Sequence, residues 1–378
     1  RPPRSTRKES SAASDVYKRQ TMIYSLKSDK EEINIGHAGT AMRFLTSYYS
    51  SILNSSKILT GSARMKERPI LILVEALNNL GADIEYIDKK GYPPIKINGK
   101  LIYGNEIALP ADVSSQYISS LMMLGVSINQ GLKIKLSTKI TSLQYIHMTK
   151  KIIERIGGNV YVKSDEIIIK QLVSNKIPDQ IVESDWSSAS YFFSLVALSD
   201  TSDLTLSSFF NKSIQGDSRI VEIYKQFGVE TNFHNNKIHL KKNNIDLPDS
   251  ISINLRDNPD LAQTIIVTCL GLGVDCKLEG LQTLKVKETD RLVAVKREID
   301  KFVVDKIAVS DQSITLKNNS KLKSGVSINT YDDHRMAMSF APLSIINPIV
   351  INNPEVVSKS YLNFWNDLES IGFNISQK

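Results

Sequence analysis

Hydrophobic and polar positions change their periodicity along the chain in a recurring order. A helix rich in small residues precedes a short strand, a polar loop, an amphipathic helix and a hairpin of two strands. In the segment 286–302, Leu292, Val295, Ile299 and Phe302 recur at helical spacing and form one apolar face. The order of these elements predicts an α/β protein.

The pattern occurs five times, which indicates an internal repeat. The small-residue helices of the five copies are predicted over residues 38–53, 114–128, 187–199, 259–273 and 334–346. Gly81, Gly157, Gly228 and Gly372 follow the second helix of four copies, where a glycine commonly ends a helix. Self-similarity at a regular spacing is typical of supersecondary units that share a core. Each copy is therefore interpreted as a βαβαββ unit packed around a local axis.

The excess positive charge is concentrated at the start of the sequence. Residues 1–20 contain six basic and two acidic residues, which is +4 of the net charge of +7. A protein that binds nucleic acid usually spreads basic residues over its folded surface, so we expect no nucleic-acid partner. Residues 1–20 also lack the apolar core of a secretory signal, while a transit peptide stays open.

Other features of the sequence bear on location. No apolar run approaches the roughly 18 residues that a membrane helix needs, so no membrane partner is expected. The two cysteines, Cys269 and Cys276, lie in apolar segments and are too few for a disulfide framework. They favour a reducing compartment, and we expect a cytoplasmic protein.

Residues suited to anions recur in the loops before helices. The free N–H groups of a helix start attract phosphate and carboxylate, and arginine binds both in a bidentate fork. The residues at these positions are Gly39, Thr40, Arg43, Arg68, Lys287, Arg291, His334, Arg335 and Lys359. Their recurrence at equivalent loops predicts a site for anionic substrates.

Neutral donors and two carboxylates accompany these cations. Ser114, Ser115 and Gln116 begin a predicted helix, where Ser114 can also be a simple N-cap. Asp260 and Glu288 lie among the cations and are candidates for proton transfer, although Asp260 can also cap a helix. No His, Cys or Asp cluster has metal-ligand spacing, so no metal site is predicted.

Several strings together resemble the 5-enolpyruvylshikimate-3-phosphate synthase family. "GTAMR", "RMKERP", "SSQ", "SSASY", "QGDSR", "VKETDR", "TYDDHRMAM" and "VSKSY" occur in the family's order from about residue 31 onwards. The resemblance implies a monomer of two domains, each an inside-out α/β barrel of three βαβαββ units, closing over the ligands. Five of the six units are present. We expect a first domain over 21–182 and a second over 183–378, the second lacking an N-terminal segment that normally completes the fold.

The resemblance also implies the reaction and the residues that carry it. The enolpyruvyl group of phosphoenolpyruvate passes to the 5-hydroxyl of shikimate 3-phosphate with release of phosphate, a step toward chorismate and aromatic amino acids. Family members need no metal or organic cofactor. Asp260 and Glu288 are the implied proton-transfer residues. The implied shikimate 3-phosphate ligands are Thr40, Ser114, Ser115, Gln116, Ser142, Tyr145, Asp260 and Lys287. The implied phosphoenolpyruvate ligands are Gly39, Arg68, Gln116, Arg291, Arg335 and Lys359.

The sequence departs from the family pattern in several places. His37 and Thr283 stand where members have asparagine, and Leu143-Gln144 replaces a Lys-Pro. The family's Lys-Ser followed by arginine has no counterpart ahead of residue 31. "DVYKRQ" (residues 15–20) can be back-translated to a string that resembles a sequencing-library adapter, so we interpret residues 1–20 as a translated adapter, a non-native tail. Because the Lys-Ser-Arg string is missing, we expect little or no turnover from this chain.

Two other functions compete with this interpretation. The sister transferase that acts on UDP-N-acetylglucosamine shares the fold, but it typically uses a loop cysteine, which neither Cys269 nor Cys276 supplies. A non-catalytic protein that binds nucleic acid through the basic tail would show salt-sensitive binding that disappears without residues 1–20.

Overall fold

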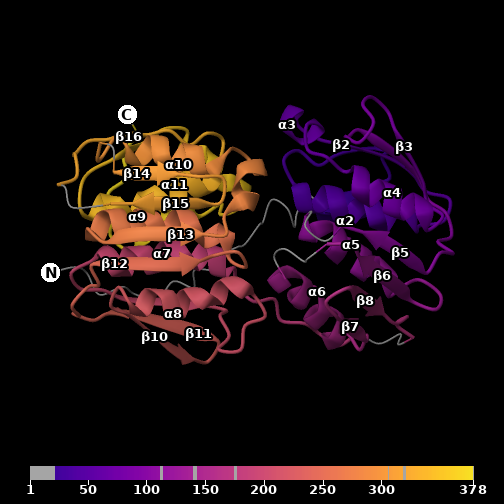
Figure 1. Ribbon diagram of the computed structural model, residues 1–378, viewed down its shortest axis with the longest axis horizontal. Helices are drawn as coiled ribbons and strands as arrows, with labels where there is room; N and C mark the ends of the chain where they lie inside the picture. The colour runs from indigo at the N-terminus through magenta and orange to yellow at the C-terminus, as the bar shows by residue number, and fades with distance from the viewer. Residues whose placement is uncertain are drawn as a thin grey trace. The chain divides into compact units, whose positions relative to one another are not determined.

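The structure is a computed structural model that describes residues 22–110, 114–138, 143–173, 177–304, 306–317 and 321–377. The tail expected over residues 1–20 and the predicted ligand Ser142 lie outside the described residues. The chain divides into two compact units between Ile181 and Val182 (Figure 1). We call residues 22–181 the N-terminal unit and residues 182–377 the C-terminal unit.

The N-terminal unit contains two sheets of identical topology. The first has the order β1-β2-β4-β3 and the second the order β5-β6-β8-β7. In each sheet the first two strands are parallel and the other neighbours are antiparallel. The strands are β1 (Glu32–Asn34), β2 (Ser56–Thr60), β3 (Asp83–Tyr86), β4 (Ile95–Asn98), β5 (Glu106–Leu109), β6 (Leu132–Leu136), β7 (Val160–Val162) and β8 (Glu166–Ile169).

The helices of this unit alternate with the strands in the βαβαββ order expected from the sequence. They are α2 (Gly39–Ser50), the short α3 (Ala63–Lys66), α4 (Leu71–Asn79), α5 (Ser115–Gly125) and α6 (Leu143–Arg155). Helix α5 packs against both α2 and α6. The repeat unit predicted from periodicity is therefore confirmed here twice.

The C-terminal unit contains sheets of three, four and two strands. Their orders are β10-β11-β9, β12-β13-β15-β14 and β16-β17. The four-stranded sheet repeats the pattern of the N-terminal unit, with a parallel pair followed by antiparallel neighbours. The strands are β9 (Asp203–Ser207), β10 (Val229–His234), β11 (Lys237–Lys242), β12 (Ser250–Asn254), β13 (Asp275–Glu279), β14 (Ile307–Val309), β15 (Ser313–Leu316), β16 (Ser327–Ile328) and β17 (Val350–Ile351).

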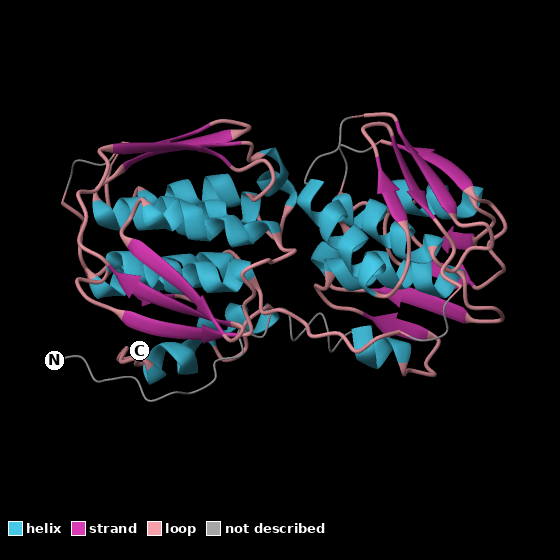
Figure 2. Cartoon of the chain, turned by 90° about the horizontal axis from the view of Figure 1, so that it is seen from below, coloured by secondary structure: helices cyan, strands magenta, loops and turns pink. Residues whose placement is uncertain are grey.

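Helices and 3₁₀ turns connect these strands. The helices are α7 (Trp186–Leu198), α8 (Ile220–Lys225), α9 (Ala262–Leu272), α10 (Arg291–Ile299), α11 (His334–Phe340) and α12 (Phe364–Ser370). The 3₁₀ turns are η1 (Gly216–Arg219), η2 (Pro259–Leu261), η3 (Gln282–Val286), η4 (Ala341–Ile345) and η5 (Pro354–Lys359). Within each unit most helices lie in layers between sheets that face outward (Figure 2), so the inside-out arrangement is confirmed.

Composition explains which helices are central. All residues of α7 are buried, and so is α9 up to Leu270, because both are apolar or small on every side. Some of their polar groups pair between the two helices, since Ser190 Oγ lies 3.0 Å from Thr264 Oγ1. The amphipathic α10 instead buries one face, on which Leu292 and Val295 are each 2% exposed.

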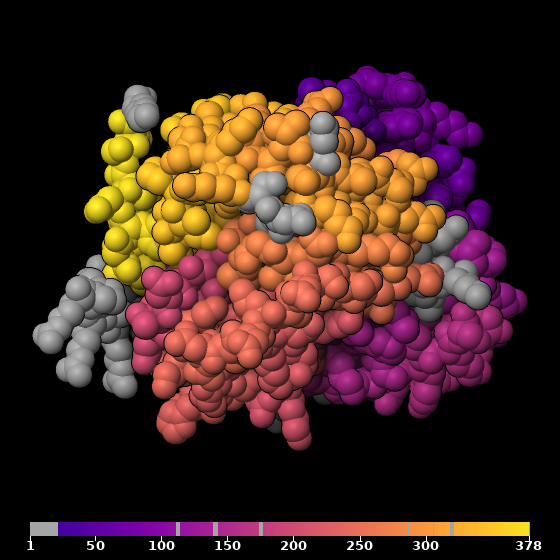
Figure 3. Space-filling model, turned by 60° about the vertical axis from the view of Figure 1, so that its left-hand side comes forward, coloured from indigo at the N-terminus to yellow at the C-terminus, as the bar shows by residue number. Residues whose placement is uncertain are grey.

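The glycines that end the second helices have the conformation predicted for them. Gly81, Gly157, Gly228 and Gly372 have φ of +104°, +92°, +78° and +107°, a region that other residues enter only with strain. The end of the described chain lies on the outside of the C-terminal unit, in yellow in Figure 3. None of the helices in the described ranges is long and apolar enough to cross a membrane.

Candidate active site

Arg291 is the centre of a buried ionic cluster in the C-terminal unit. Its guanidinium is 2% exposed and contacts three carboxylates. Nε donates to Asp333 Oδ2 at 2.6 Å, Nη1 to Asp260 Oδ1 at 2.9 Å and Nη2 to Glu288 Oε2 at 2.7 Å. The site thus joins η2, the loop before α10 and the loop before α11.

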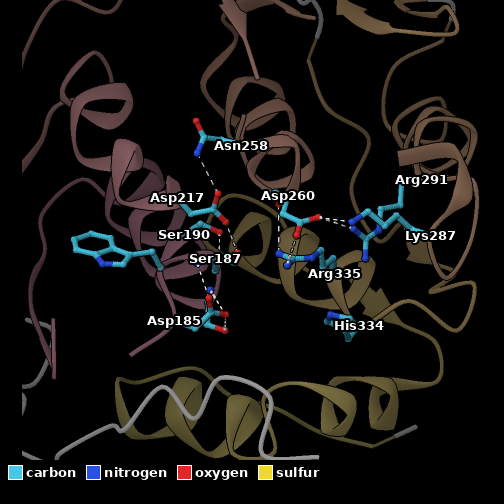
Figure 4. Close-up of polar contacts among 12 residues, drawn as sticks. Asp185, Ser187, Ser190, Asp217, Asn258, Asp260, Lys287, Arg291, His334 and Arg335 are labelled. Carbon is cyan, nitrogen blue, oxygen red and sulfur yellow. Dashed lines mark hydrogen bonds and ion pairs between the residues drawn. The ribbon is translucent and has the colours of Figure 1, made fainter. Parts of the chain in front are cut away.

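Asp260 is shared between this arginine and two further cations (Figure 4). Its Oδ2 lies 3.1 Å from Arg335 Nη2, and its Oδ1 lies 3.8 Å from Lys287 Nζ. Four residues expected from the sequence to bind the two substrates are therefore neighbours: Asp260, Lys287, Arg291 and Arg335.

The capping residues before α10 and α11 explain how Arg291 and Arg335 are positioned. Asp290 accepts from the backbone N–H of Leu292 at 3.1 Å and of Val293 at 3.2 Å, so it is the N-cap of α10. Asp333 accepts from Arg335 N at 2.9 Å and caps α11 in the same way. Arg291 and Arg335 are consequently first-turn residues of two capped helices.

Charge within the cluster controls protonation. Burial favours the neutral acid of Glu288, but the cations Arg291 and Lys287 outweigh it and hold the pKa of Glu288 well below its usual value. For Lys287, Asp260 favours the charged form, yet burial and Arg291 lower the pKa below its usual value. Burial lowers the pKa of His334 to about 4, so this imidazole is neutral at pH 7.

Lys359 lies at the end of η5 and contacts the backbone that leads into α11. Its Nζ donates to the carbonyl oxygen of Asp332 at 2.7 Å. Arg335 Nη1 reaches the Tyr191 hydroxyl of α7 and the Asp260 carbonyl oxygen, both at 3.4 Å.

Sequence reasoning missed two carboxylates of this region. Asp333 binds Arg291, and the second acid of "DDHRMAM" was its only sequence signal. Asp217 lies in "QGDSR", where Ser187 Oγ donates to it and Asn258 Nδ2 donates at 3.4 Å. Burial, with a contribution from Asp260, raises the pKa of Asp217 to about 6.

A second set of predicted residues meets in the N-terminal unit. Gln116 Nε2 of α5 donates to Thr40 Oγ1 of α2 at 3.1 Å. A Cβ placed on Gly39 would lie 2.6 Å from Arg68 Nη1, so only glycine lets this guanidinium approach the helix start. Gly39, Thr40, Arg68 and Gln116 therefore form one group.

Other predictions in this unit have different outcomes. Ser114 accepts from Gln116 N at 3.3 Å and caps α5, while Ser115 is the first residue of that helix. Tyr145 lies in the first turn of α6. Glu67, which precedes Arg68 in the chain, pairs with Arg64 at 3.0 Å.

Arg43 does not serve as the anion-binding residue that its helix-start position suggested. It is 3% exposed, and its Nη1 and Nη2 donate to the carbonyl oxygens of Gly39 and Pro69, each at 3.2 Å. It also lies 5.9 Å from the centre of the Tyr117 ring. Arg43 thus binds the backbone at the start of α2 and directly after Arg68.

The cysteines and the possible metal ligands of the described residues also bear on the site. Cys269 in α9 and Cys276 in β13 are buried, at 0% and 2% exposure, so neither offers a loop thiol. Among the residues that the structure describes, no three His, Cys, Asp or Glu side chains are grouped to hold a metal ion.

Comparison with known proteins shows the family of the chain. Residues 5–368 match the sequence profile described as EPSP synthase (3-phosphoshikimate 1-carboxyvinyltransferase). The chain belongs to the EPSP synthase family. The matched range includes most of the tail interpreted as non-native, residues 1–20, so the match does not separate this tail from the rest of the chain.

Curated EPSP synthase relatives cover nearly the whole chain. A 3-phosphoshikimate 1-carboxyvinyltransferase of Bacteroides fragilis (strain YCH46) is 43% identical over 96% of this chain and 88% of its own length. The enzyme of the same name from Colwellia psychrerythraea is 33% identical over 90% of this chain and 79% of its own length.

Solved structures support the fold. EPSP synthase from Acinetobacter baumannii is similar with a TM-score of 0.69 and 22% identity, covering 93% of this chain and 81% of its own. The enolpyruvyl transferase NikO from Streptomyces tendae gives a TM-score of 0.67 at 10% identity, covering 90% of this chain and 78% of its own.

Proposed function

We propose that this chain transfers the enolpyruvyl group of phosphoenolpyruvate to the 5-hydroxyl of shikimate 3-phosphate and releases inorganic phosphate. The observation that carries the proposal is the buried cluster in which Asp260 is shared by Arg291, Arg335 and Lys287. Each substrate bears a phosphate and a carboxylate, so several fixed cations are required. Guanidinium groups suit this task because they stay charged at any physiological pH.

The cluster also supports a division of roles. Lys359, Arg291 and Arg335 are proposed to bind phosphoenolpyruvate in the C-terminal unit, while Asp260 and Lys287 bind shikimate 3-phosphate. In the N-terminal unit, Gly39, Arg68 and Gln116 are proposed for phosphoenolpyruvate. The residues proposed there for shikimate 3-phosphate are Thr40, Ser114, Ser115, Gln116, Ser142 and Tyr145.

The carboxylates are proposed to move the protons. Without substrate, Arg291 keeps Glu288 ionised, so Glu288 is a poor acid. Substrate anions that pair with Arg291 and Arg335 replace Asp260 and Glu288 as partners, which raises the pKa of both carboxylates. They can then exchange protons with the methylene carbon of phosphoenolpyruvate and the attacking hydroxyl.

Bond changes follow from this assignment. The methylene carbon gains a proton while the 5-hydroxyl oxygen attacks the neighbouring carbon and loses its own proton. The resulting tetrahedral intermediate breaks its carbon–oxygen bond to phosphate and loses a methyl proton, which restores the double bond. No oxidation occurs, and the chain's own residues suffice for each proton step.

The competing functions have less support. UDP-N-acetylglucosamine as acceptor is disfavoured because both cysteines are buried within α9 and β13. Binding of nucleic acid through residues 1–20 has no family support. We further propose that the protein is cytoplasmic and monomeric. A molar mass of 42.3 kDa measured by light scattering, the mass of one chain, would support the monomer.

Arg335→Met tests the role proposed for the cluster. The affinity for phosphoenolpyruvate, measured by calorimetry with saturating shikimate 3-phosphate, should fall about 100-fold, since a charged hydrogen bond contributes about 2–3 kcal/mol. Arg219→Met is the matched control, because Arg219 is an exposed arginine of the same unit. Equal affinities of Arg335→Met and the parent chain would contradict the assignment.

Phosphate release from phosphoenolpyruvate that depends on shikimate 3-phosphate measures the activity itself. Phosphate release should require both substrates together.

A further inference from the structure

Two consecutive residues before α11 have an unfavourable backbone conformation. Tyr331 has φ of +53° and Asp332 has φ of +55°, in the left-handed region that residues with a Cβ enter at a cost. They directly precede Asp333, the N-cap of α11. Strain of this kind persists only where surrounding contacts hold it, and it clusters at functional sites.

A buried carboxylate of α10 holds this turn. Glu298 has no exposed surface, and its Oε1 accepts from the Tyr331 hydroxyl at 2.6 Å. Its Oε2 accepts from the backbone N–H of Asn329 at 3.0 Å and from Lys301 Nζ at 2.5 Å. Glu298 therefore binds the chain at Asn329, two residues before the strained pair, and at Tyr331, its first residue.

The turn presents groups to the candidate active site. The Asp332 carbonyl oxygen accepts from Lys359 Nζ at 2.7 Å. Asp333 binds Arg291 Nε at 2.6 Å and accepts from Arg335 N at 2.9 Å. A turn that relaxed to negative φ would redirect this carbonyl and displace the N-cap, which would move three cations proposed for phosphoenolpyruvate.

We propose that Glu298 is a positioning residue that holds the strained turn Tyr331–Asp332 and thereby sets Lys359, Arg291 and Arg335 for phosphoenolpyruvate. This proposal rests on the proposed function. Glu298 itself contacts the turn and Lys301, and it acts on the substrate only through them. Burial and Glu298 together raise the pKa of Tyr331 to about 12, so the hydroxyl remains a donor.

The test separates positioning from a general loss of structure. Glu298→Gln should weaken phosphoenolpyruvate binding, measured by calorimetry with saturating shikimate 3-phosphate, by about 10-fold, as a charged hydrogen bond is replaced by neutral ones. Affinity for shikimate 3-phosphate alone should fall clearly less, because none of its proposed ligands contacts the turn and only Asp260 contacts the arginines that the turn positions. Glu222→Gln is the control, since Glu222 is an exposed glutamate of the same unit.

A rescue variant gives the sharper readout. Glycine adopts positive φ without a steric cost, so Glu298→Gln combined with Asp332→Gly should recover most of the lost affinity. If Glu298→Gln fails to fold, Tyr331→Phe removes one of the hydrogen bonds between Glu298 and the turn. It should show the same selective loss of phosphoenolpyruvate affinity and the same rescue by Asp332→Gly. Equal loss for both ligands, no loss, or no rescue by glycine would overturn the proposal. A parent chain that binds neither ligand would overturn the proposed function itself, and this inference with it.

Discussion

At the scale of a single residue, Asp217 is a buried carboxyl whose ionised form is destabilised by its surroundings. Among the described residues, Ser187 and Asn258 donate hydrogen bonds to this carboxyl, and both donors are neutral. Asp260 and Asp185 add negative charge, and Arg335 offsets part of it. Its pKa of about 6 therefore lies above the value near 3.9 of an unfolded chain. Because the folded state binds this proton more tightly, the contribution is present below about pH 4 and is lost as the pH rises through 6.

Asp217→Asn should remove this pH dependence. Between pH 4 and pH 7 the free energy of unfolding of Asp217→Asn should improve relative to the parent chain by up to about 3 kcal/mol. Urea unfolding at four pH values measures the difference, and the opposite contribution of His334 is common to both proteins and cancels. Asp246→Asn, a substitution at an exposed position of the same unit, should show no such trend. A constant difference across the range would contradict the assigned pKa.

At the scale of elements, helix starts carry most of the proposed site. Arg291 begins α10, Arg335 lies in the first turn of α11, and Gly39 begins α2. Each helix supplies a rigid base and a local positive end that stabilises a bound anion. The caps are thus part of the site even where they touch no substrate.

Removal of a cap should therefore affect both stability and binding. Asp290→Ala leaves the N–H groups of Leu292 and Val293 without their acceptor, which should lower the free energy of unfolding by about 1 kcal/mol. Phosphoenolpyruvate affinity should fall as well, because the first turn that carries Arg291 frays. Asp290→Ser keeps a capping oxygen and should retain most of both quantities in urea unfolding and calorimetry. Identical behaviour of the two variants would rule out capping as the cause.

At the scale of the whole molecule, the repeat was readable from the sequence because its helices and strands have distinct periodicities. The glycines that end the second helices, at 81, 157, 228 and 372, were equally readable, since few residue types other than glycine adopt positive φ. The inside-out arrangement came from the family resemblance, and Figure 2 bears it out in each unit.

Contacts between distant segments could not be read in this way. Asp217 meets Asn258 and Ser187 from two other segments, and no local pattern encodes this meeting. Arg43 was misjudged for the same reason, because a helix start looks alike whether its arginine faces solvent or the carbonyl of Pro69. Glu298 is an ordinary helical glutamate in sequence, and only the turn above it reveals its role.

The acceptor substrate gives the most direct test of the whole account. Calorimetric titration of the chain with shikimate 3-phosphate, and separately with UDP-N-acetylglucosamine, compares the two enolpyruvyl acceptors under identical conditions. We predict saturable binding of shikimate 3-phosphate that Asp260→Ala weakens at least 10-fold, and no saturable binding of the nucleotide sugar. Saturable binding of UDP-N-acetylglucosamine without binding of shikimate 3-phosphate would contradict the account.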